Sequence, residues 1–90
     1  MDREKLEELH KASIKNRSAV EQQQQAGGFA ACYYCVEFLP AIEIDRYCLD
    51  EQGKETTAIC PRCQVDAILA VPIAKKTLQE LHDKYFTPTD

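Results

Sequence analysis

The chain has 90 residues, which is enough for one small domain and too few for two. Its hydrophobic fraction of 44% excludes a low-hydrophobicity disordered chain, and no apolar run reaches the roughly 20 residues of a membrane span. The formal net charge is −4, and it comes from residues 26–72, where seven acids face three bases, so the basic surface typical of nucleic-acid-binding proteins is missing.

The N-terminal segment, residues 1–25, is predicted to hold one long helix over residues 2–25. It is rich in Glu, Lys, Leu, Ala and Gln, contains no Gly or Pro, and begins with Asp2 as a capping residue. Its apolar stripe is thin, which is typical either of a solvated helix or of a polar face that contacts a partner. A third interpretation is that Arg17 pairs with core acids such as Asp45 or Asp50. The residues that interrupt the stripe are His10, Ser13, Asn16 and Arg17.

Residues 26–90 are predicted to form the core together with a C-terminal helix, as part of the same single domain. Ala26-Gly27-Gly28 ends the first helix. The alternating segment Ile44–Asp50 and the threonine-bearing segment Glu55–Ile59 are predicted to form a β-hairpin, with Gly53 at a positive φ in the turn.

Two further helices are expected after the hairpin. Val65, Ile68 and Leu69 recur at helical spacing after Cys63, which favours a helix that ends at Pro72. A last helix over about residues 74–86 is indicated by the i, i+3, i+4, i+7 pattern, and a polar tail, residues 87–90, follows. Its patterned residues are Leu78, Leu81, His82 and Tyr85.

Four of the five cysteines form two Cys-x-x-Cys pairs separated by 24 residues. These are Cys32 with Cys35 and Cys60 with Cys63. Two intervening residues let the chain curl so that both sulfurs face one ion, and backbone amides can donate to the sulfurs. Two such pairs predict a closed, structural four-thiolate zinc site, worth on the order of 10 kcal/mol to a small core.

The redox environment supports metal over disulfides. The first residues are charged and lack the apolar stretch of a signal peptide, so we expect a cytoplasmic protein with reduced thiols. No βαβ pattern precedes either pair, which disfavours redox disulfides. An iron–sulfur centre also uses four thiolates and stays open as an alternative. With four thiolates around Zn²⁺ the net charge becomes −6. Cys48, outside both pairs, is expected to pack as a small hydrophobe.

The order of cysteine pair, hairpin and second pair at the start of a helix predicts an α+β, treble-clef-like zinc finger flanked by N- and C-terminal helices. A zinc ribbon would instead place the second pair on another hairpin. Such a hairpin turn favours glycine just after its second cysteine, where this chain has Gln64.

A pattern of residues extends over most of the chain: His10, Ser13, Asn16 and Arg17, then Cys32-Tyr33-Tyr34-Cys35, Phe38, Pro40, Glu43-Ile44, Asp50 and Gly53, then Thr57-Ala58-Ile59-Cys60-Pro61-Arg62-Cys63 and Val65-Asp66, and finally Leu78, Leu81-His82 and Tyr85-Phe86. With this pattern the chain resembles a family of small bacterial proteins usually labelled only "cytoplasmic protein". The resemblance implies a zinc-binding treble-clef-like fold and no known activity. In that family an aromatic residue, often Trp, stands at the place of Cys48. Glycines expected after Cys63 and near Pro72 are absent here.

These residues bear on three classes of function. Treble clefs occur in HNH-type nucleases, which need a histidine base beside the metal. The two histidines here, His10 and His82, lie on the outer predicted helices. Four thiolates also close the metal shell, so an enzyme is not expected. Nucleic acid could bind at Tyr33, Tyr34 and Arg62, where the aromatic rings could stack on bases, but the net acidic charge of the chain opposes this. We therefore expect a protein-interaction module, an adaptor or an inhibitor, with a partner of basic charge. Its expected contact residues are His10, Asn16, Arg17, Tyr33, Tyr34 and Arg62.

Overall fold

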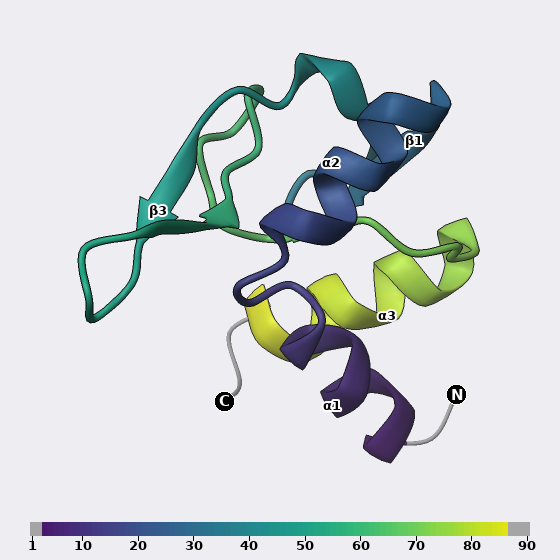
Figure 1. Ribbon diagram of the computed structural model, residues 1–90. Coiled ribbons are helices and arrows are strands. Elements are labelled where there is room, and N and C mark those ends of the chain that lie inside the picture. The colour runs from purple at the N-terminus through teal and green to yellow at the C-terminus, as the bar shows by residue number, and fades with distance from the viewer. Residues whose placement is uncertain (1–2, 87–90) are drawn as a thin grey trace.

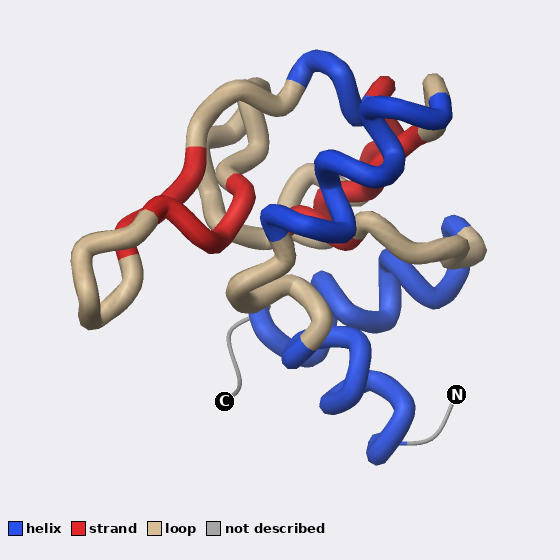
Figure 2. Tube along the Cα trace, viewed as in Figure 1, coloured by secondary structure: helices blue, strands red, loops and turns tan. Residues whose placement is uncertain are grey.

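The computed structural model describes residues 3–86 and shows a small α+β protein, which confirms the predicted class. Three α-helices accompany two small antiparallel sheets, one with strand order β2-β1-β5 and one with β3-β4 (Figures 1 and 2). The elements in chain order are α1 (Arg3–Lys11), α2 (Arg17–Ala26), β1 (Phe29–Cys32), β2 (Glu37–Pro40), the 3-10 helix η1 (Ala41–Glu43), β3 (Tyr47–Leu49), β4 (Glu55–Ala58), β5 (Ile68–Leu69) and α3 (Lys75–Phe86).

The prediction of one helix over residues 2–25 is wrong, because the chain breaks between α1 and α2. The hydroxyl of Ser13 donates to the carbonyl of His10, and Lys15 adopts the left-handed conformation with φ 51°. The Lys15 amide then donates to Thr57 Oγ1 at 2.8 Å, so the loop is tied to β4. Helix propensity alone favours continuation here, and tertiary hydrogen bonds override it. The expected cap, Asp2, lies outside the described residues.

The predicted break after α2 is confirmed. Gly27 has φ 68°, and the amides of Gly27 and Gly28 donate to the carbonyls of Gln24 and Gln23. A left-handed residue just past the last turn satisfies otherwise unpaired helix carbonyls, and glycine adopts it without a Cβ penalty. The chain thus reverses directly from α2 into β1.

The segment after this turn forms a hairpin that the sequence patterns do not predict. β1 pairs with β2, with Ala31 opposite Phe38, and the first cysteine pair occupies the connecting turn. β1 also pairs with β5, with Ala31 opposite Leu69. Three buried residues of β1, Ala30, Ala31 and Cys32, therefore lie at the centre of the larger sheet.

The predicted hairpin of β3 and β4 is confirmed, with shorter strands than expected. Gly53 has φ 80° in the turn, as predicted. The carboxylate of Asp50 accepts hydrogen bonds from the amides of Gln52 and Lys54, which fixes the turn. The hairpin projects from the rest of the protein (Figure 1), and Leu49 on it is 66% exposed.

The helix predicted after Cys63 is wrong, and α3 is confirmed. Residues 64–74 contain no helix, and Ile68 and Leu69 form β5. Their spacing also suits a buried strand, since two adjacent apolar residues at the centre of a sheet are covered on both faces. In α3, Leu78 and Leu81 are fully buried, and the helix packs beside α1 (Figure 1). The predicted polar tail, residues 87–90, lies outside the described residues.

The chain offers no membrane-spanning helix within the part that the structure describes, because its helices are too short and too polar to cross a bilayer.

Candidate metal centre

The four paired cysteines meet in one cluster. Their sulfur atoms all lie within 4.8 Å of one another. The Sγ of Cys32 is 3.7 Å from that of Cys63, and the Sγ of Cys35 is 3.8 Å from that of Cys60. A tetrahedron with metal–sulfur bonds of about 2.3 Å has edges of about 3.8 Å. The cluster thus has the dimensions of a site for a single tetrahedral ion, and none of the five thiols is in a disulfide.

Two turns position these sulfurs. The first connects β1 to β2, and in it the amide of Cys35 donates to the Sγ of Cys32 at 3.4 Å. The second is closed by the Cys60 amide donating to the Val65 carbonyl and by the Gln64 amide donating to the Cys60 carbonyl. A further bond, from the Tyr33 amide to the Ala67 carbonyl at 3.0 Å, joins the two turns. Pairing of β5 with β1 therefore brings the two cysteine pairs together.

The residue after each pair has a left-handed backbone. Val36 has φ 56° and Gln64 has φ 64°. This conformation is where glycine is favoured, and it costs a residue with a Cβ about 1–2 kcal/mol. The absence of glycine after Cys63 therefore does not indicate a helix there. Gln64 itself adopts the left-handed backbone conformation of a turn in which glycine is usually found.

We expect Gln64→Gly to stabilise the protein. Gln64 is exposed, so the change removes backbone strain with little loss of packing. A gain of about 0.5–1 kcal/mol corresponds to a rise of roughly 3–6 °C in melting temperature for a domain of this size. Gln64→Ala is the control, because alanine keeps the Cβ and should leave the melting temperature nearly unchanged. Equal melting temperatures for the glycine and alanine variants would contradict the strain assigned to this position.

Burial governs the chemistry of the thiols. It raises the pKa of Cys32 well above the usual range and raises the pKa of Cys35 to about 12. Burial also opposes ionisation of Cys60, but hydrogen bonds from the amides of Cys63 and Arg62 outweigh it and lower the pKa. Charged thiolates in such a place need a cation to balance them, and amide donors reduce the remaining charge. The donor set therefore fits a thiophilic divalent ion such as Zn²⁺.

Tyr33, one of the expected contact residues, lies in the core. It is only 2% exposed, and its hydroxyl is hydrogen-bonded to His10 Nδ1 at 2.8 Å and to Ser13 Oγ at 3.2 Å. His10 in turn stacks on Tyr85, with ring centroids 4.0 Å apart. The Tyr33 carbonyl accepts a hydrogen bond from His82. Both histidines thus hold α1 and α3 against the first cysteine turn.

Asn16 is also interior, which contradicts its assignment to an exposed partner-binding face. It is 6% exposed, its amide nitrogen donates to the Ile68 carbonyl at 2.8 Å, and its amide oxygen accepts from the Ala58 amide at 3.1 Å. It therefore links α2 to β4 and β5, the two strands that flank the second cysteine pair. The one signal in the sequence is an Asn inside the predicted helix, since Asn favours the start of a helix over its interior.

Arg17 lies half-exposed beside the projecting hairpin. It pairs with Glu21 and Glu55, and its guanidinium lies 4.5 Å from the centre of the Tyr47 ring. The sequence also allowed Arg17 to pair with acids such as Asp45 or Asp50. Arg17 does pair with acids, but these are Glu21 and Glu55.

The remaining expected contact residues, Tyr34 and Arg62, reach the surface next to the four-sulfur cluster. Tyr34 is 43% exposed and meets Phe86 edge-on, with centroids 4.9 Å apart. Arg62 lies 3.5 Å from the carboxylate of Glu43. Of the three residues expected to contact nucleic acid, Tyr34 is therefore exposed, Tyr33 is buried and Arg62 is already paired with an acid. Cys48 lies in β3, opposite Thr57 and outside the four-sulfur cluster.

Comparison of the chain with protein-family models, with curated proteins and with solved structures finds no match. The resemblance to the bacterial "cytoplasmic protein" family therefore stays a prediction, and the arguments below depend on the geometry of the site.

Proposed function

We propose that the four-cysteine cluster binds one structural zinc ion, and that the protein is a non-catalytic interaction module of the cytoplasm, where thiols stay reduced. The observation that carries the metal proposal is the set of sulfur–sulfur distances, 3.7 and 3.8 Å, which fit the edges of a single-ion tetrahedron. A multi-iron cluster attaches its cysteines to different iron atoms and needs them further apart. A single iron ion has similar dimensions and remains the alternative to zinc.

The scaffold that we propose for this zinc differs from a treble clef. Both cysteine pairs lie in tight turns, and each is followed by a strand, β2 or β5, that pairs with β1. This is the order expected of a zinc ribbon, in which the ion joins two turns at the end of a sheet. The metal would then stabilise the fold, because it would join the turn between β1 and β2 to the turn before β5 at one end of the sheet.

A catalytic role is disfavoured by the same geometry. Four thiolates fill a tetrahedral shell, whereas a catalytic zinc keeps a position for water or substrate. The HNH-like nuclease alternative needs a histidine base beside the metal. Here His10 and His82 are hydrogen-bonded to Tyr33 and packed among aromatic rings. We therefore propose that the protein acts by binding.

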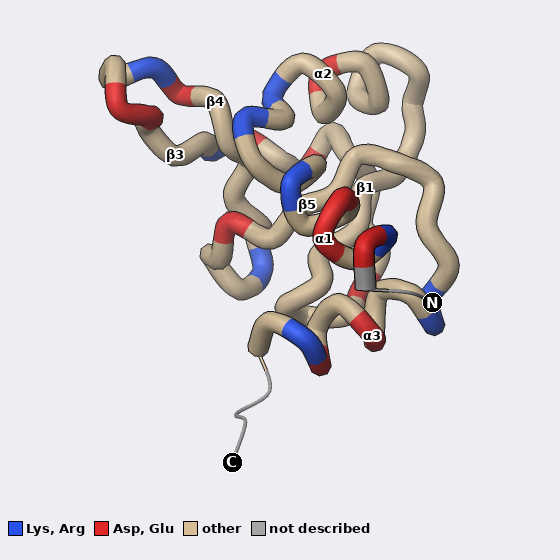
Figure 3. The backbone as a smooth tube through the Cα atoms, turned by 90° about the horizontal axis from the view of Figure 1, so that it is seen from below, with Lys and Arg blue, Asp and Glu red and all other residues tan. Residues whose placement is uncertain are grey.

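A protein partner of basic charge is favoured over nucleic acid. The zinc-loaded chain carries a net charge of −6, because four thiolates and one Zn²⁺ add −2 to the formal −4. The turn of the projecting hairpin carries two acids, Asp50 and Glu51, and one base, Lys54 (Figure 3). Acidic surfaces repel phosphate backbones and attract basic proteins, as expected of an adaptor or of an inhibitor that mimics nucleic-acid charge.

The experiment that tests this function measures both classes of partner. We expect the zinc-loaded protein to show no binding to mixed-sequence RNA or DNA by fluorescence anisotropy at physiological salt. We expect it to retain a basic protein from its native host, in a nuclease-resistant and salt-sensitive complex. The nucleic-acid alternative is supported instead if oligonucleotides bind and Tyr34→Ala weakens that binding, since Tyr34 is the exposed aromatic beside the metal.

A further inference from the structure

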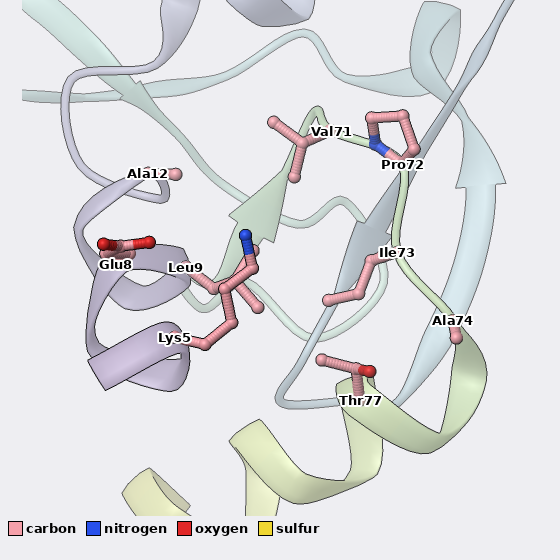
Figure 4. Close-up of a pocket in the computed structure, with 9 residues that line it drawn as sticks. All are labelled: Lys5, Glu8, Leu9, Ala12, Val71, Pro72, Ile73, Ala74 and Thr77. Carbon is pink, nitrogen blue, oxygen red and sulfur yellow. The ribbon is translucent and has the colours of Figure 1, made fainter. Parts of the chain in front are cut away.

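Within the described residues, the four-sulfur cluster is the place best suited to react with an oxidant. The pocket between α1 and the start of α3 is lined mainly by apolar side chains, and no cysteine or histidine lines it (Figure 4). Oxidants of the peroxide class react with thiolates, and a bound metal ion keeps its cysteine ligands deprotonated at neutral pH. The metal-loaded cluster therefore combines four reactive groups in one place.

The four sulfurs differ in their access to solvent. Cys35 and Cys63 are partly exposed, whereas Cys32 and Cys60 are 0% exposed. The amide hydrogen bonds of the turns go to the two buried sulfurs. The Cys35 amide donates to Cys32, and the amides of Arg62 and Cys63 donate to Cys60. An amide donor stabilises a thiolate and makes its sulfur a weaker nucleophile, so a small oxidant should attack Cys35 and Cys63 first.

Each partly exposed sulfur contacts a buried sulfur of the other turn. The Sγ of Cys63 lies 3.7 Å from that of Cys32, and the Sγ of Cys35 lies 3.8 Å from that of Cys60. The two turns are held at this separation by the protein itself, through the pairing of β1 with β5 and the amide-to-carbonyl hydrogen bond that joins the turns. Shortening such a contact to a sulfur–sulfur bond of about 2 Å leaves the register of the sheet unchanged.

We propose that the centre responds to peroxide by exchanging its metal ion for two disulfides between the turns, Cys32–Cys63 and Cys35–Cys60. This inference rests on the proposed zinc site and concerns its regulation. In the reducing cytoplasm the zinc-loaded form is the resting state. Because both disulfides join the same two turns that the ion joins, the oxidised chain keeps its fold after the metal is lost.

The reaction balances with hydrogen peroxide as the oxidant. The Cys35 thiolate attacks one peroxide oxygen and the oxygen–oxygen bond breaks, which gives a sulfenic acid and a hydroxide that takes up a proton to leave as water. The Cys60 thiolate then attacks the sulfenic sulfur, the disulfide bond forms, and the second hydroxide leaves as water in the same way. Each disulfide thus consumes one peroxide and two protons, and two electrons pass from the sulfurs to the peroxide. Cys63 and Cys32 react by the same steps.

Disulfide mapping of the full chain tests the inference. The reduced, zinc-loaded protein is treated with a small excess of hydrogen peroxide, alkylated, and digested with trypsin and chymotrypsin. Trypsin cuts between the cysteines of the second pair, after Arg62, and chymotrypsin cuts between those of the first pair, after Tyr33 or Tyr34. Mass spectrometry of the fragments then distinguishes every pairing. We expect disulfides between the turns to exceed those within a pair at least about tenfold, because the fold already holds the reacting sulfurs in contact.

Two further readouts follow the metal and the fold. A chromophoric chelator should report the release of the bound zinc, and dithiothreitol with added zinc should restore the loaded form. Circular dichroism should show that the oxidised chain keeps its helices, whereas the reduced chain stripped by a chelator should lose them. Cys48→Ala is the matched control, because Cys48 lies in β3 outside the cluster, and its variant should form the same two disulfides.

Four results would overturn the inference: disulfides within the pairs, a disulfide that includes Cys48, zinc that stays bound under excess peroxide, or an oxidised chain that unfolds like the stripped one. The zinc content of the reduced protein, measured before peroxide is added, separates these results from a failure of the proposed function. A reduced protein without zinc would remove both proposals, whereas a zinc-loaded protein with other disulfides would remove this one alone.

Discussion

Cys60→Ser is expected to unfold the protein at physiological temperature and to abolish zinc binding. Cys60 is fully buried, and its sulfur lies at one corner of the four-sulfur cluster. A structural four-cysteine zinc contributes on the order of 10 kcal/mol, and domains of this size have only about 5–15 kcal/mol of net stability. Far-ultraviolet circular dichroism and thermal melting measure the loss.

Cys48→Ala is the control for that variant. Cys48 is half-buried in β3 and lies outside the cluster, so its replacement removes one sulfur atom from a packed surface. We expect a loss of about 1 kcal/mol and unchanged zinc content. If Cys48→Ala released the metal and Cys60→Ser retained it, the assignment of the ligands would be wrong.

Asn16→Ala is expected to lower the melting temperature by roughly 10–20 °C. Alanine leaves the Ile68 carbonyl and the Ala58 amide without their hydrogen-bond partner in the interior. Two unsatisfied buried groups cost about 2–4 kcal/mol together, and each kcal/mol corresponds to roughly 4–8 °C in a domain of this length. Differential scanning calorimetry of the zinc-loaded proteins measures the shift.

Arg17→Ala separates this structural role from a role in binding. The guanidinium pairs with exposed glutamates and stacks on Tyr47, and contacts of this kind contribute about 1 kcal/mol or less. Its melting temperature should therefore fall much less than that of Asn16→Ala. A change of only one or two degrees for Asn16→Ala would contradict the internal position of Asn16 and restore it to the partner-binding face.

The elements that the sequence predicts correctly are those with strong local signals. The pattern of α3, the glycines after α2 and the turn of the β3–β4 hairpin depend on the residues next to them. The approach of the two sulfurs within each cysteine pair belongs to the same group, because Cys-x-x-Cys spacing alone places them on one side of a turn. These features need no knowledge of the rest of the fold.

The features that were missed depend on distant contacts. The break between α1 and α2 is held by bonds from Lys15 and Asn16 to β4 and β5, 42 to 52 residues further along the chain. Ile68 and Leu69 have the same spacing in a helix and in a buried strand, and pairing with β1 decides between them. Tyr33 is interior because α1 and α3 cover it, which its position between two cysteines does not reveal.

Native mass spectrometry of the protein purified from its host, with elemental analysis, tests the central claim most directly. The expected result is one zinc ion per chain with Cys32, Cys35, Cys60 and Cys63 protected from alkylation and Cys48 reactive. A metal-free chain with two disulfides, a chain that carries iron with the visible absorbance of an iron–thiolate centre, or a zinc-loaded chain with any of the four cysteines freely alkylated would contradict the account.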